Sequence, residues 1–183
     1  GVINGYQGRF RPNDTITRAE MAAILDKIMK YRVKADNTFS DLDENWYTDS
    51  ILKVNFAEVM VGSDGKVRPK DNITRQEAVV MVCKALDIPE SNTPSGFVDS
   101  DEIGAWALGY VNAMANLGYI SGVGGNRFAP RDNITRAAVV TILDNVIKAL
   151  YQEEGTYTGN VDGVAIVSSG GTELKDMNIT GDI

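Results

Sequence analysis

The sequence predicts a mainly α-helical protein of three tandem repeats, followed by a C-terminal segment rich in β-strand. One helix start is written three times, as DTITRAEMAAIL from Asp14, DNITRQEAVVMV from Asp71 and DNITRAAVVTIL from Asp132. Their arginines, Arg18, Arg75 and Arg136, lie 57 and 61 residues apart. After Tyr151 the pattern changes, because apolar and polar residues alternate between glycines. These observations separate a helical repeat region from a β-rich tail.

Further markers define the repeated unit. Each arginine is preceded by a glycine and a proline: Gly5 and Pro12, Gly62 and Pro69, Gly122 and Pro130. Further upstream, FSDL at Phe39 matches FVDS at Phe97, and Trp46 matches Trp106. A full unit therefore has a Phe-x-Asp lead-in, a helix with the tryptophan, a Gly-rich turn and the Thr-Arg helix. The predicted boundaries are 1–36, 37–92 and 93–151 for the repeats and 152–183 for the tail.

The first repeat lacks its lead-in and its tryptophan helix. Comparison with the other repeats predicts about 35 further residues upstream in the native product. Either those residues were cleaved or another chain supplies that helix. In the third repeat, Gly118 is expected to terminate the tryptophan helix as its C′ residue. Glu58 stands at the equivalent place in the second repeat, so that helix is expected to end differently.

The start of each Thr-Arg helix has a clear capping pattern. The predicted N-caps are Thr17, Thr74 and Thr135. Glu20 and Glu77 follow three residues later and complete a capping box, which Ala138 breaks in the third repeat. Behind the caps, apolar stripes face inward: Met21, Ile24, Leu25 and Ile28 in the first helix, and Val139, Ile142, Leu143 and Val146 in the third. The second helix is apolar nearly all round, so three helices meeting along a common axis are expected, with a groove beside each cap.

The arginine at the first helical position has no capping role. A helix N-terminus carries partial positive charge, so a cation there is mildly unfavourable. Two explanations remain open. The arginine holds a carboxylate of a neighbouring repeat, Asp41 or Asp99, or it binds an external anion beside free backbone N–H groups.

Composition excludes several functions. With no histidine, neither a Ser-His-Asp triad nor a His-containing zinc site can form. The net charge of −7 argues against nucleic-acid binding. No apolar run reaches the roughly 18 residues of a membrane span. Cys83 is the only cysteine, and its apolar surroundings predict a buried, inert thiol.

These motifs resemble the S-layer homology family: ITRAE, ITRQE and ITRAA, the Gly-x-x-x-x-Phe-x-Pro turn, and the Phe-x-Asp and Trp lead-in. The resemblance covers about residues 1 to 150 and implies a pseudo-threefold, three-pronged helical spindle. It also implies an extracellular protein of the bacterial cell surface, without catalytic residues, metal or cofactor. Such domains hold surface proteins non-covalently to secondary cell-wall polymers, commonly through a pyruvylated amino-sugar in grooves between repeats.

The resemblance also assigns roles to individual residues. Arg18, Arg75 and Arg136 would face the ligand carboxylate or order the groove. Asp41 and Asp99 would accept sugar hydroxyls, Trp46 and Trp106 would line the groove wall, and Gly5, Gly62 and Gly122 would let the backbone approach the sugar. Core packing of the tryptophans and simple turn geometry of the glycines are the structural alternatives.

Departures from the family pattern reduce the number of grooves that are expected to bind ligand. Val67 replaces a phenylalanine, Ala138 replaces the motif glutamate, and the first repeat is incomplete. At most one or two grooves are expected to be competent to bind the ligand. Arg75 and Arg136 are the favoured ligand-binding arginines.

In the tail, TGNV at 158 and TGDI at 180 suggest a 22-residue rung, the start of a parallel β-helix. The alternative is a disordered linker with two strand-like patches.

Two other functions compete with wall binding. The repeats could serve self-assembly of a surface lattice, with vestigial grooves. The chain could also be the anchor region of a β-helical polysaccharide-processing enzyme.

Overall fold

Each of the three repeated sequences begins a helix in the computed structural model, which describes residues 9–181. These helices are α1 (Arg18–Met29), α3 (Arg75–Ala85) and α5 (Arg136–Val146). At each N-terminus the threonine hydroxyl accepts the backbone N–H three residues later, and both predicted capping boxes are present. The three threonine caps are therefore confirmed, and so is the prediction that Ala138 breaks the capping box of the third helix.

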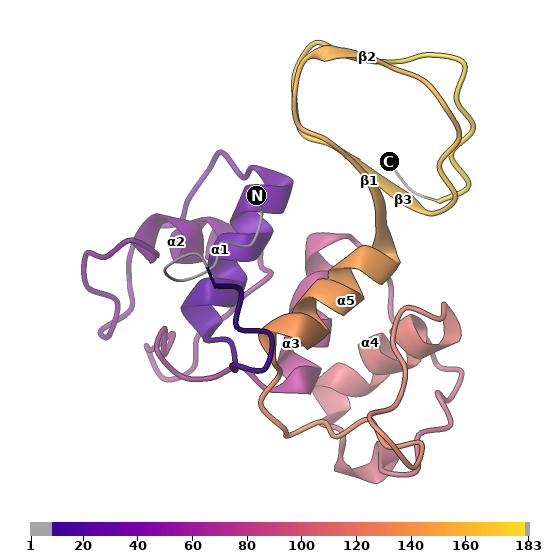
Figure 1. The fold of residues 1–183 in the computed structure, drawn as a ribbon. Helices are drawn as coiled ribbons and strands as arrows, with labels where there is room; N and C mark the ends of the chain where they lie inside the picture. Colours follow the sequence, from indigo (N-terminus) through magenta and orange to yellow (C-terminus); the bar gives the residue numbers. More distant parts are fainter. Residues whose placement is uncertain (1–8, 182–183) are drawn as a thin grey trace.

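Two further helices lie at or just after the tryptophans, α2 (Thr48–Phe56) and α4 (Ala105–Asn116), with a 3-10 turn, η1 (Ser100–Glu102), before α4. Trp106 lies in the first turn of α4, whereas Trp46 lies in the turn just before α2. Helix α2 packs on α1, and α4 packs on α3 (Figure 1). The Thr-Arg helix of one repeat is thus covered by the tryptophan helix of the next.

Helices α2 and α4 end in the same way, contrary to expectation. Gly118 follows α4 with φ of +74°, as predicted for a C′ glycine. Glu58 follows α2 with φ of +57°, so it takes the same left-handed conformation without being glycine. The backbone geometry of the turn prevails over the preference of a residue with a Cβ.

This conformation makes Glu58 a site for stabilisation. Glu58→Gly is expected to raise the free energy of unfolding by about 0.5–1 kcal/mol, because glycine adopts positive φ without the steric cost. Chemical denaturation measures the change, and Gly118→Ala is the matched control with the opposite expected sign. Equal stability of Glu58→Gly and the unsubstituted chain would contradict the argument.

A ring of backbone hydrogen bonds joins the three caps at the centre. The N–H of Ile16 donates to the carbonyl of Ile134 at 3.1 Å, that of Ile134 to Ile73 at 3.0 Å, and that of Ile73 to Ile16 at 3.0 Å. All three isoleucines are buried. The ring closes only when each repeat contacts both others, so the repeats form one unit.

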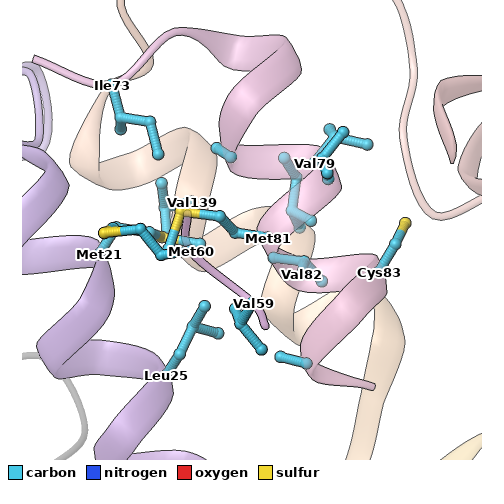
Figure 2. Close-up of a cluster of buried hydrophobic side chains, with 14 of the residues drawn as sticks. Met21, Leu25, Val59, Met60, Ile73, Val79, Met81, Val82, Cys83 and Val139 are labelled. Carbon is cyan, nitrogen blue, oxygen red and sulfur yellow. The ribbon is translucent and has the colours of Figure 1, made fainter. Parts of the chain in front are cut away.

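The core lies between α1, α3 and α5. Figure 2 shows Met21 and Leu25 of α1 packed with Val79 and Val82 of α3 and Val139 of α5. The predicted apolar stripes of α1 and α5 are buried, and α3 is buried on nearly all sides. The predicted burial of Cys83 is confirmed, and this burial raises the pKa of its thiol to about 12, which disfavours the reactive thiolate.

The tail forms two parallel strand pairs beside the helices (Figure 1). Strand β1 (Ile147–Tyr151) pairs with β3 (Val164–Val167), and β2 (Gly155–Tyr157) pairs with β4 (Thr172–Leu174). Gly155 pairs with Thr172, 17 positions later, so the predicted 22-residue period is not the register. The repeated TG pairs mark turns and do not set the pairing. Strand β1 also follows α5 directly, before the predicted boundary at 152.

Gln152 attaches the tail to the helical part. Its side-chain amide donates to the carbonyls of Lys27 at 2.8 Å and Ile28 at 3.0 Å, at the C-terminal end of α1. Those carbonyls have no partner within the helix, so Gln152 satisfies groups that would otherwise need water. Residues 152–154 therefore join β1 to β2 and attach both strands to α1.

Helix α5 has no tryptophan helix packed on it within residues 9–181. Val140 is only half-buried, whereas the equivalent Ala22 and Val79 are fully buried. A mostly apolar cavity of about 410 Å³ lies at this face, between α1, α5 and β1.

Candidate binding grooves between repeats

The backbone at the start of each Thr-Arg helix is already hydrogen-bonded to the next repeat. The N–H groups of Arg18, Arg75 and Arg136 donate to the carbonyls of Asp71, Asp132 and Asp14, each at 2.9 Å. The N–H of the following residue donates to a carbonyl of Pro69, Pro130 or Pro12. An external anion therefore finds no free N–H group at these positions, contrary to one of the two expectations for the arginine.

The arginine side chains reach a carboxylate of the next repeat, but not the expected aspartates. Arg18 Nη1 donates to Glu77 Oε1 at 2.8 Å, and Arg136 Nη1 donates to Glu20 Oε1 at 3.3 Å. The other oxygen of each glutamate accepts the N–H of its capping threonine. The pairing of these arginines with Asp41 or Asp99 was wrong, because the capping box aims the motif glutamate across the groove.

Arg75 lacks such a carboxylate because Ala138 occupies the equivalent position. Its Nη2 donates to the Ser121 carbonyl at 2.9 Å, and its guanidinium lies 5.2 Å from the ring centre of Phe128. Within residues 9–181 its Nε is buried without a hydrogen-bond partner, and the residue is 9% exposed. Burial lowers the pKa of the Arg75 guanidinium from its usual value. The positive charge of Arg75 is therefore buried and only partly compensated, by one carbonyl and one aromatic ring.

Asp41 and Asp99 each hold the backbone of the two residues that precede the proline of the turn, Pro69 or Pro130. The two oxygens of Asp41 accept the N–H groups of Val67 at 2.9 Å and Arg68 at 2.8 Å. Those of Asp99 accept Phe128 and Ala129, both at 2.8 Å. Because Asp99 is also only 4% exposed, its geometry is that of a structural carboxylate.

The predicted glycines serve close backbone contacts. A Cβ at Gly62 would lie 2.6 Å from the Lys66 carbonyl oxygen, and one at Gly122 would lie 3.0 Å from the Arg127 carbonyl oxygen. The turn itself therefore requires glycine at 62. Gly5 lies outside the described residues.

Both tryptophans are exposed, so the core alternative was wrong. Trp46 is 67% exposed and Trp106 is 55% exposed. A Cβ at Gly104 would lie 2.6 Å from Nε1 of Trp106, so the absent side chain leaves room for the indole there. The position of the Trp106 ring depends on this glycine.

One cavity brings together predicted site residues from all three repeats. It has a volume of about 470 Å³ and is lined by Arg18 of the first repeat, Gly62 of the second and Trp106 of the third. Its remaining lining residues are Val59, Met60, Val61, Ser63, Arg68, Glu77, Val80, Met81 and Lys84. Neither Arg75 nor Arg136, the arginines favoured from sequence, lines it.

Arg68 and Lys84 are the lining cations that sequence reasoning missed. Arg68 is the middle residue of the Val-Arg-Pro turn, and Lys84 lies nine positions after Arg75, near the end of α3. Lys84 lies seven positions after Glu77, close to two full helical turns, so it shares a face of α3 with that lining residue, which is the signal the sequence offered.

Three helical repeats joined by a central ring, with a cationic, tryptophan-bearing cavity where they meet, define a repeat-built binding module. The chain belongs to the S-layer homology domain family, whose sequence model matches residues 1–22, 38–79 and 96–140. Members of this family are proteins of the cell surface and cell wall, which confirms the predicted extracellular location. Surface anchoring is the general role that membership supports.

Individual relatives show the same module in different contexts. A cellulosome-anchoring protein of Acetivibrio thermocellus is 31% identical over 80% of this chain and 35% of its own length. The surface-layer 125 kDa protein of Lysinibacillus sphaericus is 28% identical over 98% of this chain and 15% of its own. An amylopullulanase of Thermoanaerobacterium thermosulfurigenes is 30% identical over 76% of this chain and 8% of its own.

The chain thus corresponds to a small part of each of these relatives. Within the described residues, no helix is long and apolar enough to cross a membrane.

Proposed function

We propose that this chain holds its parent protein on the bacterial cell wall by binding a pyruvylated secondary cell-wall polymer. The observation that carries the proposal is the convergence of Arg18, Gly62 and Trp106, from three repeats, on one cavity. The family's pseudo-threefold spindle is the arrangement we infer for the three repeats, and the ring of isoleucine hydrogen bonds supports it.

The size and charge of the cavity suit an acidic sugar. A volume of about 470 Å³ falls within the range of small-molecule sites. Three cations, Arg18, Arg68 and Lys84, line it against the single carboxylate of Glu77. The protein as a whole is acidic, so this local excess of positive charge acts only at short range, where salt screens it less. An exposed indole offers an apolar face on which a sugar ring can stack.

The names of the relatives support an anchoring function. Surface-layer and cellulosome-anchoring proteins share this module with an amylopullulanase, so one module serves both structural and enzymatic parents. Anchoring of a polysaccharide-processing enzyme is therefore a second form of the same proposal. The parallel strand pairs support a reading of the tail as the start of a β-helical domain.

Trp106→Ala tests the assignment of the cavity. We expect the substitution to weaken retention on purified cell wall at least about tenfold, which corresponds to about 1.4 kcal/mol of binding free energy. Sedimentation with wall fragments at graded protein concentrations measures it. Trp46→Ala is the matched control, because Trp46 is also exposed but does not line this cavity.

The same assay separates wall binding from lattice self-assembly. Retention that is equal for Trp106→Ala and the unsubstituted chain would refute the assignment of this cavity as the binding site. Ordered arrays formed without wall polymer, together with no retention on the wall, would favour self-assembly with vestigial grooves.

A further inference from the structure

We propose that Arg68 and Lys84, rather than Arg18, contact the carboxylate of the bound polymer, and that Arg18 is a positioning residue. This inference rests on the proposed function and assigns the anion contact within that same cavity. It follows from which donor groups of the three cations are already occupied and which face the cavity unpaired.

Each of the three guanidinium nitrogens of Arg18 donates a hydrogen bond inside the protein. Nε donates to the Val67 carbonyl at 2.9 Å, Nη1 to Glu77 at 2.8 Å and Nη2 to the Val61 carbonyl at 3.3 Å. Its side chain is 14% exposed. A ligand carboxylate that took these donors would leave Glu77 and two carbonyls without their partner, at a cost comparable to the gain. Arg18 instead fixes the positions of the Val67 turn and of Glu77.

Arg68 presents its guanidinium from a fixed backbone. Its N–H is held by Asp41 at 2.8 Å, and the next residue, Pro69, restricts the chain further. The side chain is exposed, and within the described residues it forms no ion pair. A guanidinium can bind a carboxylate through two parallel hydrogen bonds, so an unpaired one at the cavity wall is suited to this ligand.

Lys84 of α3 supplies a second cation at the wall of the cavity. Its Nζ donates to the Glu58 carbonyl at 3.3 Å, in an exposed contact, and it forms no ion pair within the described part of the chain. The flexible stem and weak internal contact leave the ammonium free to turn toward an anion in the cavity.

The equivalent positions in the other repeats explain why we assign the carboxylate contact to this cavity and not to another groove. Arg68 and Lys84 correspond to Ala129 and Asn145 in the third repeat, which carry no charge. In the first repeat they correspond to Arg11 and Lys27, and Arg11 forms an ion pair with Asp14 at 3.6 Å. The groove beside Arg75 therefore lacks both additional cations, and the groove beside Arg18 has both without a carboxylate partner.

A double-mutant cycle with a chemically altered ligand tests the assignment. The probe is purified wall polymer that carries pyruvyl ketals, used native or with its carboxylates converted to neutral amides. For the full chain we expect amidation to weaken binding about tenfold or more. For Arg68→Gln/Lys84→Gln we expect binding to the native polymer to be weaker by a similar factor, and amidation to have no further effect. The melting temperature of this variant should be unchanged.

Arg18→Gln distinguishes a positioning role from direct contact. It should lower the melting temperature and weaken binding, yet keep the preference for native over amidated polymer. The inference is overturned if the double variant keeps that preference, or if Arg18→Gln alone abolishes it. A full chain that binds neither polymer would instead refute the proposed function, and loss of binding by Trp106→Ala together with an unaffected double variant would refute only this inference.

Discussion

Asp99→Ala is expected to lower the free energy of unfolding by about 2–6 kcal/mol. The substitution leaves the N–H groups of Phe128 and Ala129 buried without an acceptor, and each such group costs about 1–3 kcal/mol. For a chain of this size the melting temperature should fall by about 2–4 °C per kcal/mol. Calorimetry or denaturant titration measures the loss.

The same carboxylate makes stability depend on pH. Burial alone would raise the pKa of Asp99, but hydrogen bonds from the Phe128 and Ala129 backbone and the charge of Arg127 hold its pKa below the usual value. A lowered folded-state pKa contributes stability above the unfolded value, about 3.9, and that contribution is lost as pH falls further through the folded pKa. Asp99→Ala should therefore reduce the acid sensitivity of unfolding below about pH 4. A variant with the same stability slope as the unsubstituted chain in this range would contradict the role.

Asp41→Ala is the matched control for Asp99→Ala. Asp41 makes the equivalent pair of hydrogen bonds, to Val67 and Arg68, but its side chain is only half-buried. Water can replace the lost acceptor there, so a smaller loss of stability is expected. An equal loss of unfolding free energy for both variants would show that burial does not determine the cost of removing the carboxylate.

Ala138→Glu is expected to raise the free energy of unfolding by about 1–2 kcal/mol. A glutamate at this position would complete the third capping box and give Arg75 the carboxylate that Glu77 gives Arg18 and Glu20 gives Arg136. The gain should be large for a single ion pair because the buried Arg75 charge now lacks compensation. Thermal unfolding at low and moderate salt measures it.

Ala138→Gln separates the two contributions. Glutamine can complete the capping box without charge, so its gain should be smaller and independent of pH. The gain from Ala138→Glu should be lost below the pKa of the new carboxyl. If Ala138→Glu destabilises the chain, the space beside Arg75 is not that of an absent carboxylate.

Several features followed from sequence because they depend on neighbouring residues. The threonine caps, the capping boxes, the apolar stripes and the C′ glycine at 118 are set within one or two helical turns. The family resemblance pointed to Trp106 and Gly62, which line the same cavity, and their roles in binding stay a prediction. The failed expectations were of another kind: the 22-residue rung, a different ending for α2, and aspartate partners for the arginines.

The sequence by itself determined three helical repeats, their caps and their family, because periodicity and capping are local properties of the chain. Only the tertiary structure decided which arginine, tryptophan and glycine meet. The ring through Ile16, Ile73 and Ile134 brings each repeat against both others, so one cavity takes Arg18, Gly62 and Trp106 from three separate units. The same closure pairs Arg18 and Arg136 with the motif glutamates, whereas Arg68 and Lys84 at the cavity wall form no ion pair with any residue that the structure describes. Contacts across repeats depend on side-chain direction in space, which no spacing along the chain specifies.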